Sequence, residues 1–229
     1  MGPNIEIIHK EIAPKGKGYI VVRECPPQEL DGLVRRGAEE LFAAGARQVF
    51  AASTDPNAPL AEGPELRHVY DMLGMYRDLG PDRPRPEGRL TLEPLTGESG
   101  EAWNAILNES FHFVPSSATY DGTDLAAMLA GPYRCGFALL DGQRVGVYEC
   151  GFKKAQPEIG SVGLDAEHRG KGLGRELLLT VMDDLAGLGH TRCWLQVATT
   201  NAPAYALYRA VGFGEEEVLV RWYEVIRHG

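Results

Sequence analysis

A glycine-rich segment offers the clearest chemistry in this 229-residue chain. Residues 169–174 read Arg-Gly-Lys-Gly-Leu-Gly; the apolar residues Val162 and Leu164 precede them and an amphipathic helical pattern follows. Glycines in the first turns of a helix cost about 1 kcal/mol each relative to alanine. Bare amides at the positive end of a helix dipole can instead converge on phosphate oxygens, with Arg169 and Lys171 as further donors. A tight strand-to-helix connection with two exposed cations is the alternative.

A second block about thirty residues later makes the first more specific. After a strand pattern at 193–197, residues 201–213 read N-A-P-A-Y-A-L-Y-R-A-V-G-F. Together the two blocks resemble the acetyl-CoA-binding core of the GNAT acetyltransferase superfamily; the motifs lie within 159–213 and the wider similarity covers 89–226. The resemblance implies an α/β (α+β) fold with a mixed central sheet flanked by helices. It also implies acetyl-CoA as cosubstrate, without a metal.

The resemblance assigns cofactor contacts residue by residue. The CoA pyrophosphate is expected at the glycine loop, the pantetheine arm beside the preceding strand and Asn201, and the thioester sulfur near Tyr208. Capping of the next helix is a compatible role for Asn201. The predicted cofactor-binding residues are Val162, Gly163, Leu164, Arg169, Gly170, Lys171, Gly172, Leu173, Gly174, Arg175, Asn201 and Tyr208.

Acetyl transfer to an amine also needs an acid for the leaving thiolate and an acceptor for the amine proton. A tyrosine suits the first task because its reference pKa of about 10 keeps it protonated at pH 7. Tyr208 is therefore the predicted general acid, with packing on an amphipathic helix as the alternative. Glu149 and Glu158, on or beside predicted central strands, are the candidate bases. The similar protein N-terminal alanine acetyltransferases carry a glutamate where this chain has Gln196, which cannot accept a proton.

These residues predict an N-acetyltransferase that moves an acetyl group from acetyl-CoA to a primary amine by direct attack in a ternary complex. A small-molecule amine is the favoured acceptor. Protein N-terminal or lysine amines remain open, as does a non-catalytic CoA-binding module. The acceptor pocket is expected around residues 111–115 and 215–217.

Composition and charge bound the other classes. A net charge of −9 argues against a nucleic-acid partner, since phosphate contacts need a basic surface. No apolar run approaches the roughly 20 residues that cross a bilayer, and the start lacks the apolar core of a signal peptide, so we expect a cytoplasmic protein with no membrane partner. A homodimer stays open. The cysteines show neither metal-ligand nor redox-pair spacing and are expected to be reduced core residues: Cys25, Cys135, Cys150 and Cys193.

Apolar periodicity predicts the elements that hold these residues. The proline-rich segment 80–88 cannot continue a helix or a central strand. We place a catalytic domain at 87–229, with the order strand, helix, helix, three strands, helix, strand, helix, strand that the GNAT family uses.

Residues 1–86 are predicted to form a smaller αβ half-domain, a degenerate copy of the second half of the same fold, as in tandem GNAT proteins. Its strands are expected at 18–24 and 48–52 and its helices at 28–44 and 66–79. The helix-to-strand stretch 41–54 echoes 185–199, and 69–75 echoes 207–213; chance similarity is the alternative. Because residues 25–30 replace the glycine loop, this copy is expected to bind no CoA and to help shape the acceptor pocket.

Overall fold

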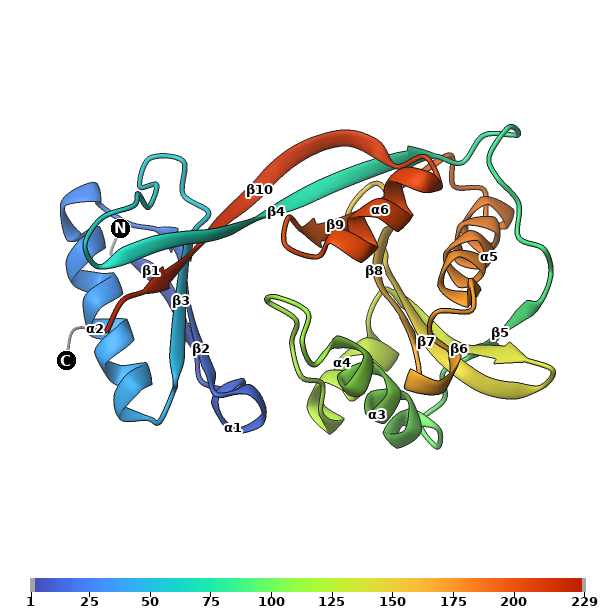
Figure 1. Cartoon of the computed structure of the whole chain (residues 1–229), viewed down its shortest axis with the longest axis horizontal. Helices are drawn as coiled ribbons and strands as arrows, with labels where there is room; N and C mark the ends of the chain where they lie inside the picture. Colours follow the sequence, from blue (N-terminus) through green and yellow to red (C-terminus); the bar gives the residue numbers. More distant parts are fainter. Residues whose placement is uncertain (1–2, 228–229) are drawn as a thin grey trace. The chain divides into compact units, whose positions relative to one another are not determined.

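The computed structural model describes residues 3–227, which form two compact units. Within this range the first consists of residues 3–73, 198–200 and 218–227, and the second of Gly74–Val197 and Asn201–Glu217. Two long strands, β4 (Leu66–Asp78) and β10 (Gly214–Val225), each run from one unit into the other (Figure 1). The chain thus changes unit within strands, whereas the predicted division at 86/87 lay in the proline-rich segment.

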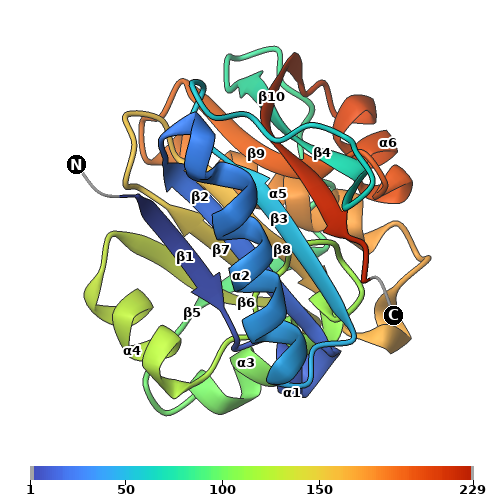
Figure 2. The ribbon, with the colours of Figure 1, turned by 90° about the vertical axis from the view of Figure 1, so that its left-hand side faces the viewer.

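The first unit is a sheet with the strand order β1-β2-β3-β10-β4. The hairpin of β1 (Asn4–Ile8) and β2 (Lys17–Glu24) is antiparallel, and the short helix α1 (Ile12–Lys15) lies in its connection. Strand β3 (Gln48–Ser53) runs parallel to β2 after the crossover helix α2 (Leu30–Ala43). Figure 2 shows α2 over these strands. Its apolar positions recur at helical spacing, so Leu30, Val34 and Leu41 are buried against Ile20 and Val49.

The second unit has the strand order β4-β9-β8-β7-β6-β5, and its elements follow the predicted order, which confirms the expected fold class. The elements are β5 (Leu90–Pro94), α3 (Gly100–Phe111), α4 (Gly122–Ala130), β6 (Tyr133–Leu140), β7 (Gln143–Gly151), β8 (Glu158–Leu164), α5 (Leu173–Gly187), β9 (Arg192–Ala198) and α6 (Ala202–Ala210). Between β6 and β7, Asp141 and Gly142 both have positive φ, as a two-residue hairpin turn requires.

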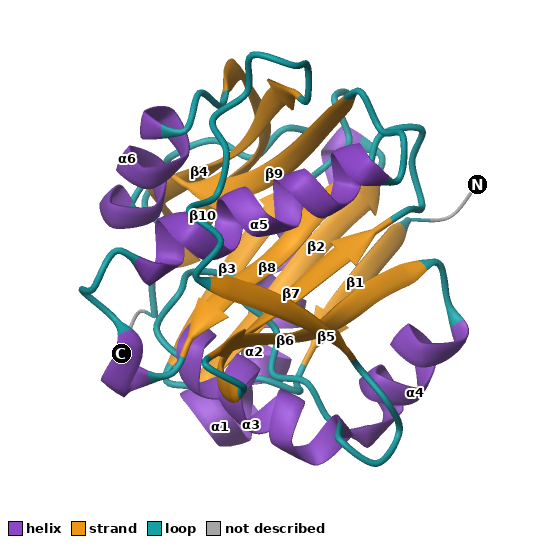
Figure 3. Ribbon diagram, turned by 90° about the vertical axis from the view of Figure 1, so that its right-hand side faces the viewer, coloured by secondary structure: helices purple, strands orange, loops and turns teal. Residues whose placement is uncertain are grey.

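Helices α3 and α5 pack on the sheet of the second unit. Phe137 and Val147, which pair across β6 and β7, pack with Trp103 and Leu107 of α3. The helix α5 packs against β5 and β8, and Figure 3 shows it lying across the strands. Because α5 begins at the glycine loop, this packing fixes the place of the loop.

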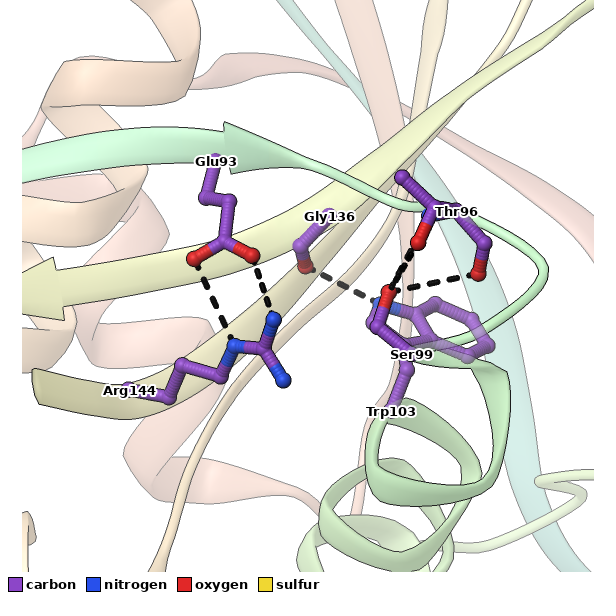
Figure 4. Close-up of polar contacts among 6 residues, drawn as sticks. All are labelled: Glu93, Thr96, Ser99, Trp103, Gly136 and Arg144. Carbon is purple, nitrogen blue, oxygen red and sulfur yellow. Dashed lines mark hydrogen bonds and ion pairs between the residues drawn. The ribbon is translucent and has the colours of Figure 1, made fainter.

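The N-terminus of α3 is anchored by polar contacts, drawn in Figure 4. The indole Nε1 of Trp103 donates to the Gly136 carbonyl at 3.0 Å, and the Ser99 hydroxyl donates to the Thr96 carbonyl at 3.2 Å. Arg144 of β7 forms an ion pair with Glu93 of β5. Helix α3 therefore has a fixed position on the sheet, and so does the start of the loop that follows it.

The helix predicted at 66–79 is wrong, because this segment is β4. Leu66, Val69, Tyr70 and Leu73 have helical spacing, but β4 lies between β10 and β9, whose backbones satisfy its own. Long-range pairing decides the conformation here. The proposed echo between 69–75 and 207–213 therefore fails, since a strand stands against the helix α6.

Candidate active site

The glycine loop between β8 and α5 is open at its backbone. Gly170 and Gly172 have φ of 74° and 78°, in the left-handed region that favours glycine. A Cβ at Gly170 would meet nothing within 4 Å, and at Gly172 the nearest atom would be Arg89 Nη2 at 3.8 Å. Gly172 is also the N-cap residue of α5, so the free amides of the first turn follow it directly. This geometry suits an anion bound by backbone N–H groups.

The turn that leads into the loop is held by side chains that sequence reasoning missed. Asp165 accepts hydrogen bonds from the backbone N–H of His168 at 3.0 Å and pairs with its ring Nδ1 at 2.6 Å. Arg169, a predicted phosphate ligand, donates from Nε to the Leu164 carbonyl at 3.0 Å and lies 3.5 Å from Glu109. Lys171 is exposed on the loop, and Arg175 is exposed in the first turn of α5. Arg169 thus also braces the end of β8.

Strands β8 and β9 separate beside this loop. Within residues 3–227 they pair at one position, Glu158 with Trp194, whereas β7 and β8 pair along their length. Parallel neighbours of seven residues each normally continue the ladder, so backbone groups beyond Glu158 face a gap. The predicted pantetheine segment, Val162 to Leu164, lies on the β8 side of this gap.

The end of β8 is closely packed by α3. A Cβ at Gly163 would lie 2.8 Å from Cβ of Ser110, so this position requires glycine. Ser110 also donates to the Leu164 carbonyl at 2.9 Å, and Arg169 donates to the same oxygen. The Leu164 carbonyl is therefore already satisfied, and only other backbone groups of this segment are open to a ligand.

Helix α6 carries the other two predicted cofactor residues. Asn201 Oδ1 accepts from the Ala204 amide at 3.4 Å, so the predicted capping role of Asn201 is confirmed. Tyr208 lies seven residues further along the chain, about two helical turns, and the centre of its ring is 6.0 Å from that of Phe213. Burial raises the pKa of Tyr208 to about 12. Its phenol therefore stays protonated through the whole neutral range, as a proton donor requires.

Glu149 on β7 is a buried carboxylate, 7% exposed. Its Oε2 accepts from Ser161 Oγ at 3.1 Å and from Tyr120 OH at 3.3 Å. Burial raises the pKa of Glu149, and the two hydroxyls partly oppose that rise. Oε1 points at the bulge of β8, where a Cβ on Gly160 would lie 3.2 Å away.

Glu158, the second candidate base, is more open and lies where β8 and β9 part. Its Oε1 accepts from Gln196 Nε2 at 2.7 Å. Gln196 cannot take a proton, but this contact gives it a role: it fixes one oxygen of Glu158. On the same edge, the Lys154 ammonium lies 3.9 Å from the centre of the Trp194 ring.

The segment after α3, expected near the acceptor, is tied to the helix. Asn108 clamps Tyr120 by accepting from its N–H and donating to its carbonyl, both at 2.8 Å. Within the segment, His112 packs edge-on against Phe113, which is 89% exposed. From the sequence we named His112 and Phe113 and missed the contact between Asn108 and Tyr120. The signal for it in the sequence is a single polar residue, Asn108, among the apolar positions of α3.

The acidic stretch 215–217, at the start of β10, was the other expected wall of the acceptor pocket. Glu216 accepts from Tyr205 OH at 2.8 Å and pairs with Arg209 at 3.2 Å. Glu217 accepts from Tyr76 OH. These carboxylates therefore join α6, β10 and β4 within the second unit, so their charges are partly compensated by protein groups.

All four cysteines are free and buried, as predicted, and burial raises the pKa of Cys135 and Cys193 to about 12. Across residues 3–227 no group of three or more His, Cys, Asp or Glu side chains could hold a metal ion. In the same range, no helix has the length and apolar character to cross a bilayer.

The glycine loop and the parted strands β8 and β9 lie within a stretch of the chain that matches a family of acyl-group transferases. The model of the acetyltransferase (GNAT) family matches residues 89–213, and the chain belongs to this family. Over 183 residues it is 32% identical to the mycothiol acetyltransferase of Clavibacter michiganensis subsp. michiganensis, an alignment that covers 78% of this chain and 58% of that protein. The chain thus spans less than two thirds of that relative.

Solved structures show the same fold. A GCN5-related N-acetyltransferase from Sphaerobacter thermophilus superposes with a TM-score of 0.66 at 20% identity, over 100% of this chain and 78% of that one. A tandem GNAT protein from the clavulanic acid biosynthesis pathway gives 0.54 at 16% identity, over 91% and 74%. The fold agrees with the family match, and it is that match and the Clavibacter relative that confirm the predicted superfamily and the predicted enzyme class.

Proposed function

We propose that this enzyme transfers the acetyl group of acetyl-CoA to the primary amine of a small molecule. The observation that carries the proposal is the gap between β8 and β9, which opens after Glu158 at the start of β8 and continues along this strand toward the glycine loop at its end. An elongated ligand with a phosphate at one end and amides along its length matches these two features. The Clavibacter relative is named a mycothiol acetyltransferase, which favours a small molecule over a protein as the acceptor.

The residues present fit acetyl-CoA. The open amides at Gly170 and Gly172 and the start of α5 would hold the pyrophosphate, with Lys171 and Arg175 as flanking cations. When bound, acetyl-CoA supplies an activated thioester. The chain's part is to orient it, to accept a proton from the amine and to return a proton to the leaving sulfur, all within one ternary complex.

Within this scheme we assign Tyr208 to proton donation and Glu158 to proton acceptance. Tyr208 remains protonated at neutral pH because burial raises its pKa to about 12. Glu158 is the more open carboxylate, and Gln196 holds one of its oxygens, leaving the other for an amine or a bridging water. Glu149, the other candidate base, is buried and bonded to Ser161, and burial raises its pKa.

The cofactor site is tested by Gly172→Asp, measured by calorimetry with acetyl-CoA. The new carboxylate would occupy the phosphate position, so binding should be lost, whereas the strain of a side chain at positive φ should lower the melting temperature only as much as in the control. Gly189→Asp is the matched control: Gly189 also has positive φ and open space around it, but lies at the far end of α5, about 22 Å away along the helix. Wild type and control should bind one acetyl-CoA per chain.

An unchanged affinity in Gly172→Asp would overturn the phosphate-cradle assignment. A panel of small amines, peptides with free N-termini and lysine peptides, followed by thiol release, then tests the acceptor. Turnover with peptides and none with small amines would contradict the proposed substrate class. Binding of acetyl-CoA without turnover on any member would instead point to a CoA-binding module.

A further inference from the structure

The proline-rich segment before β5 is strapped along α5. Arg83 and Arg85 both donate to Asp183 Oδ1, each at 2.6 Å. Seven residues earlier on the helix, Glu176 accepts from the backbone N–H groups of Glu87 at 2.9 Å and of Arg89 at 3.0 Å. Positions seven apart lie on one face of a helix, so the segment follows α5 toward the glycine loop.

Glu176 is a charged residue in a buried position of α5. It is 1% exposed, and a buried carboxylate is costly unless hydrogen bonds replace its water. Two backbone amides supply those bonds, and the carboxylate lies in the first turn of α5, near the positive end of the helix dipole. The backbone at residues 87–89 therefore has a fixed place beside the first turn.

This placement brings Arg89 to the glycine loop. Its Nη2 lies 3.8 Å from where a Cβ on Gly172 would be, the nearest atom to that position. The Arg89 side chain is 41% exposed and its Nε lies 3.2 Å from Glu87. A guanidinium carries five N–H donors, so this pairing leaves donors for a phosphate, which arginine can bind in a bidentate way.

We propose that Arg89 is a further ligand of the CoA pyrophosphate and that Glu176 is the positioning residue that sets it beside Gly172. The inference rests on the proposed cofactor role of the glycine loop. Arg89 stands outside that loop, 83 positions before Gly172, and reaches it only through the strap on α5.

The test is calorimetric titration of Arg89→Ala with CoA and with 3′-dephospho-CoA. Loss of one charge-assisted contact to phosphate should raise Kd about tenfold for both ligands, and Arg89→Lys should recover part of the loss. Arg85→Ala is the matched control: it removes the same charge from the same segment, but its partner Asp183 lies about 10 Å further along α5, so Kd should stay within about twofold. Melting curves establish that each variant is folded.

The role of Glu176 is tested by a double-mutant cycle. Glu176→Gln should weaken binding in the wild-type background and have little further effect in Arg89→Ala, because it acts through Arg89. Equal effects in both backgrounds would overturn the positioning role.

Two results would overturn the assignment of Arg89. One is a Kd for Arg89→Ala within twofold of wild type. The other is a weakening with CoA that disappears with 3′-dephospho-CoA, since Arg89 would then serve the 3′-phosphate. If Gly172→Asp abolishes binding while Arg89→Ala does not weaken it, the cofactor site stands and this inference alone fails. If Gly172→Asp also binds normally, the proposed function fails first.

Discussion

Tyr208→Phe should separate catalysis from stability. The change removes one oxygen and keeps the ring that packs near Phe213. Burial raises the pKa of Tyr208. Among the side chains that the structure describes, none forms a hydrogen bond with its hydroxyl, so the substitution leaves none of them unsatisfied, and the free energy of unfolding should change by less than about 1 kcal/mol.

The effect on turnover should be far larger. A lost general acid costs about 10²- to 10⁴-fold in rate, which corresponds to about 2.7 to 5.4 kcal/mol in the barrier. The affinity for acetyl-CoA should remain near wild type, because the hydroxyl acts on the leaving sulfur and not on the phosphate end. In the wild type, a pKa of about 12 keeps Tyr208 protonated, so its titration should produce no alkaline fall in kcat below about pH 10.

The assay is thiol release from acetyl-CoA with the best amine of the panel, combined with calorimetry and thermal melts. Tyr205→Phe is the matched control on the same helix, because Tyr205 is already engaged with Glu216 at 2.8 Å and should change kcat by less than about twofold. If Tyr208→Phe keeps kcat within about twofold of wild type, or if both variants lose activity equally, the assignment of the acid is refuted.

Two further predictions concern the carboxylates. Burial raises the pKa of Glu149 in the folded state, so the folded wild type binds that proton more tightly and loses stability as the pH rises from about 4.5 through the folded pKa. Glu149→Gln should therefore gain stability relative to the wild type over that range and match it below. If the melting temperatures of the two proteins differ by the same amount at all pH values, this prediction is wrong. Gln196→Glu would place a second carboxylate against Glu158, where Gln196 now donates at 2.7 Å, so the two carboxylates should share one proton. The acidic limb of the pH profile of kcat/KM should then move to higher pH. If this limb does not move, Glu158 is not the base.

Local features were predictable and long-range ones were not. The glycine loop and α5 are specified by neighbouring residues, through positive φ at Gly170 and Gly172 and through an apolar stripe on the helix, so both were expected. In contrast, β4 has helical apolar spacing, and only its neighbours β10 and β9 make it a strand.

The site follows the same division. Motif positions were found, but the contacts that orient them join distant residues. Arg89 and Glu176 are 87 positions apart, and Tyr120 and Glu149 are 29 apart. A contact between distant residues does not change the apolar periodicity around either one. In the sequence, the buried Glu176 therefore cannot be distinguished from the exposed polar residues of α5. The predicted catalytic and cofactor roles themselves stay predictions.

The two units share a strand arrangement. In the first unit, β2, α2 and β3 form a parallel crossover, and β10 lies next to β3 in the sheet. In the second unit, β8, α5 and β9 form a parallel crossover, and β4 lies next to β9. Each crossover is therefore followed by a strand inserted from the opposite end of the chain. We propose on this basis that the first unit is a degenerate copy. The first unit lacks a glycine loop, because Pro26 and Pro27 stand before α2 and prolines carry no N–H to donate to a phosphate. Of the two crossover helices, only α5 should therefore bind CoA. A calorimetric stoichiometry of two acetyl-CoA molecules per chain would refute this proposal.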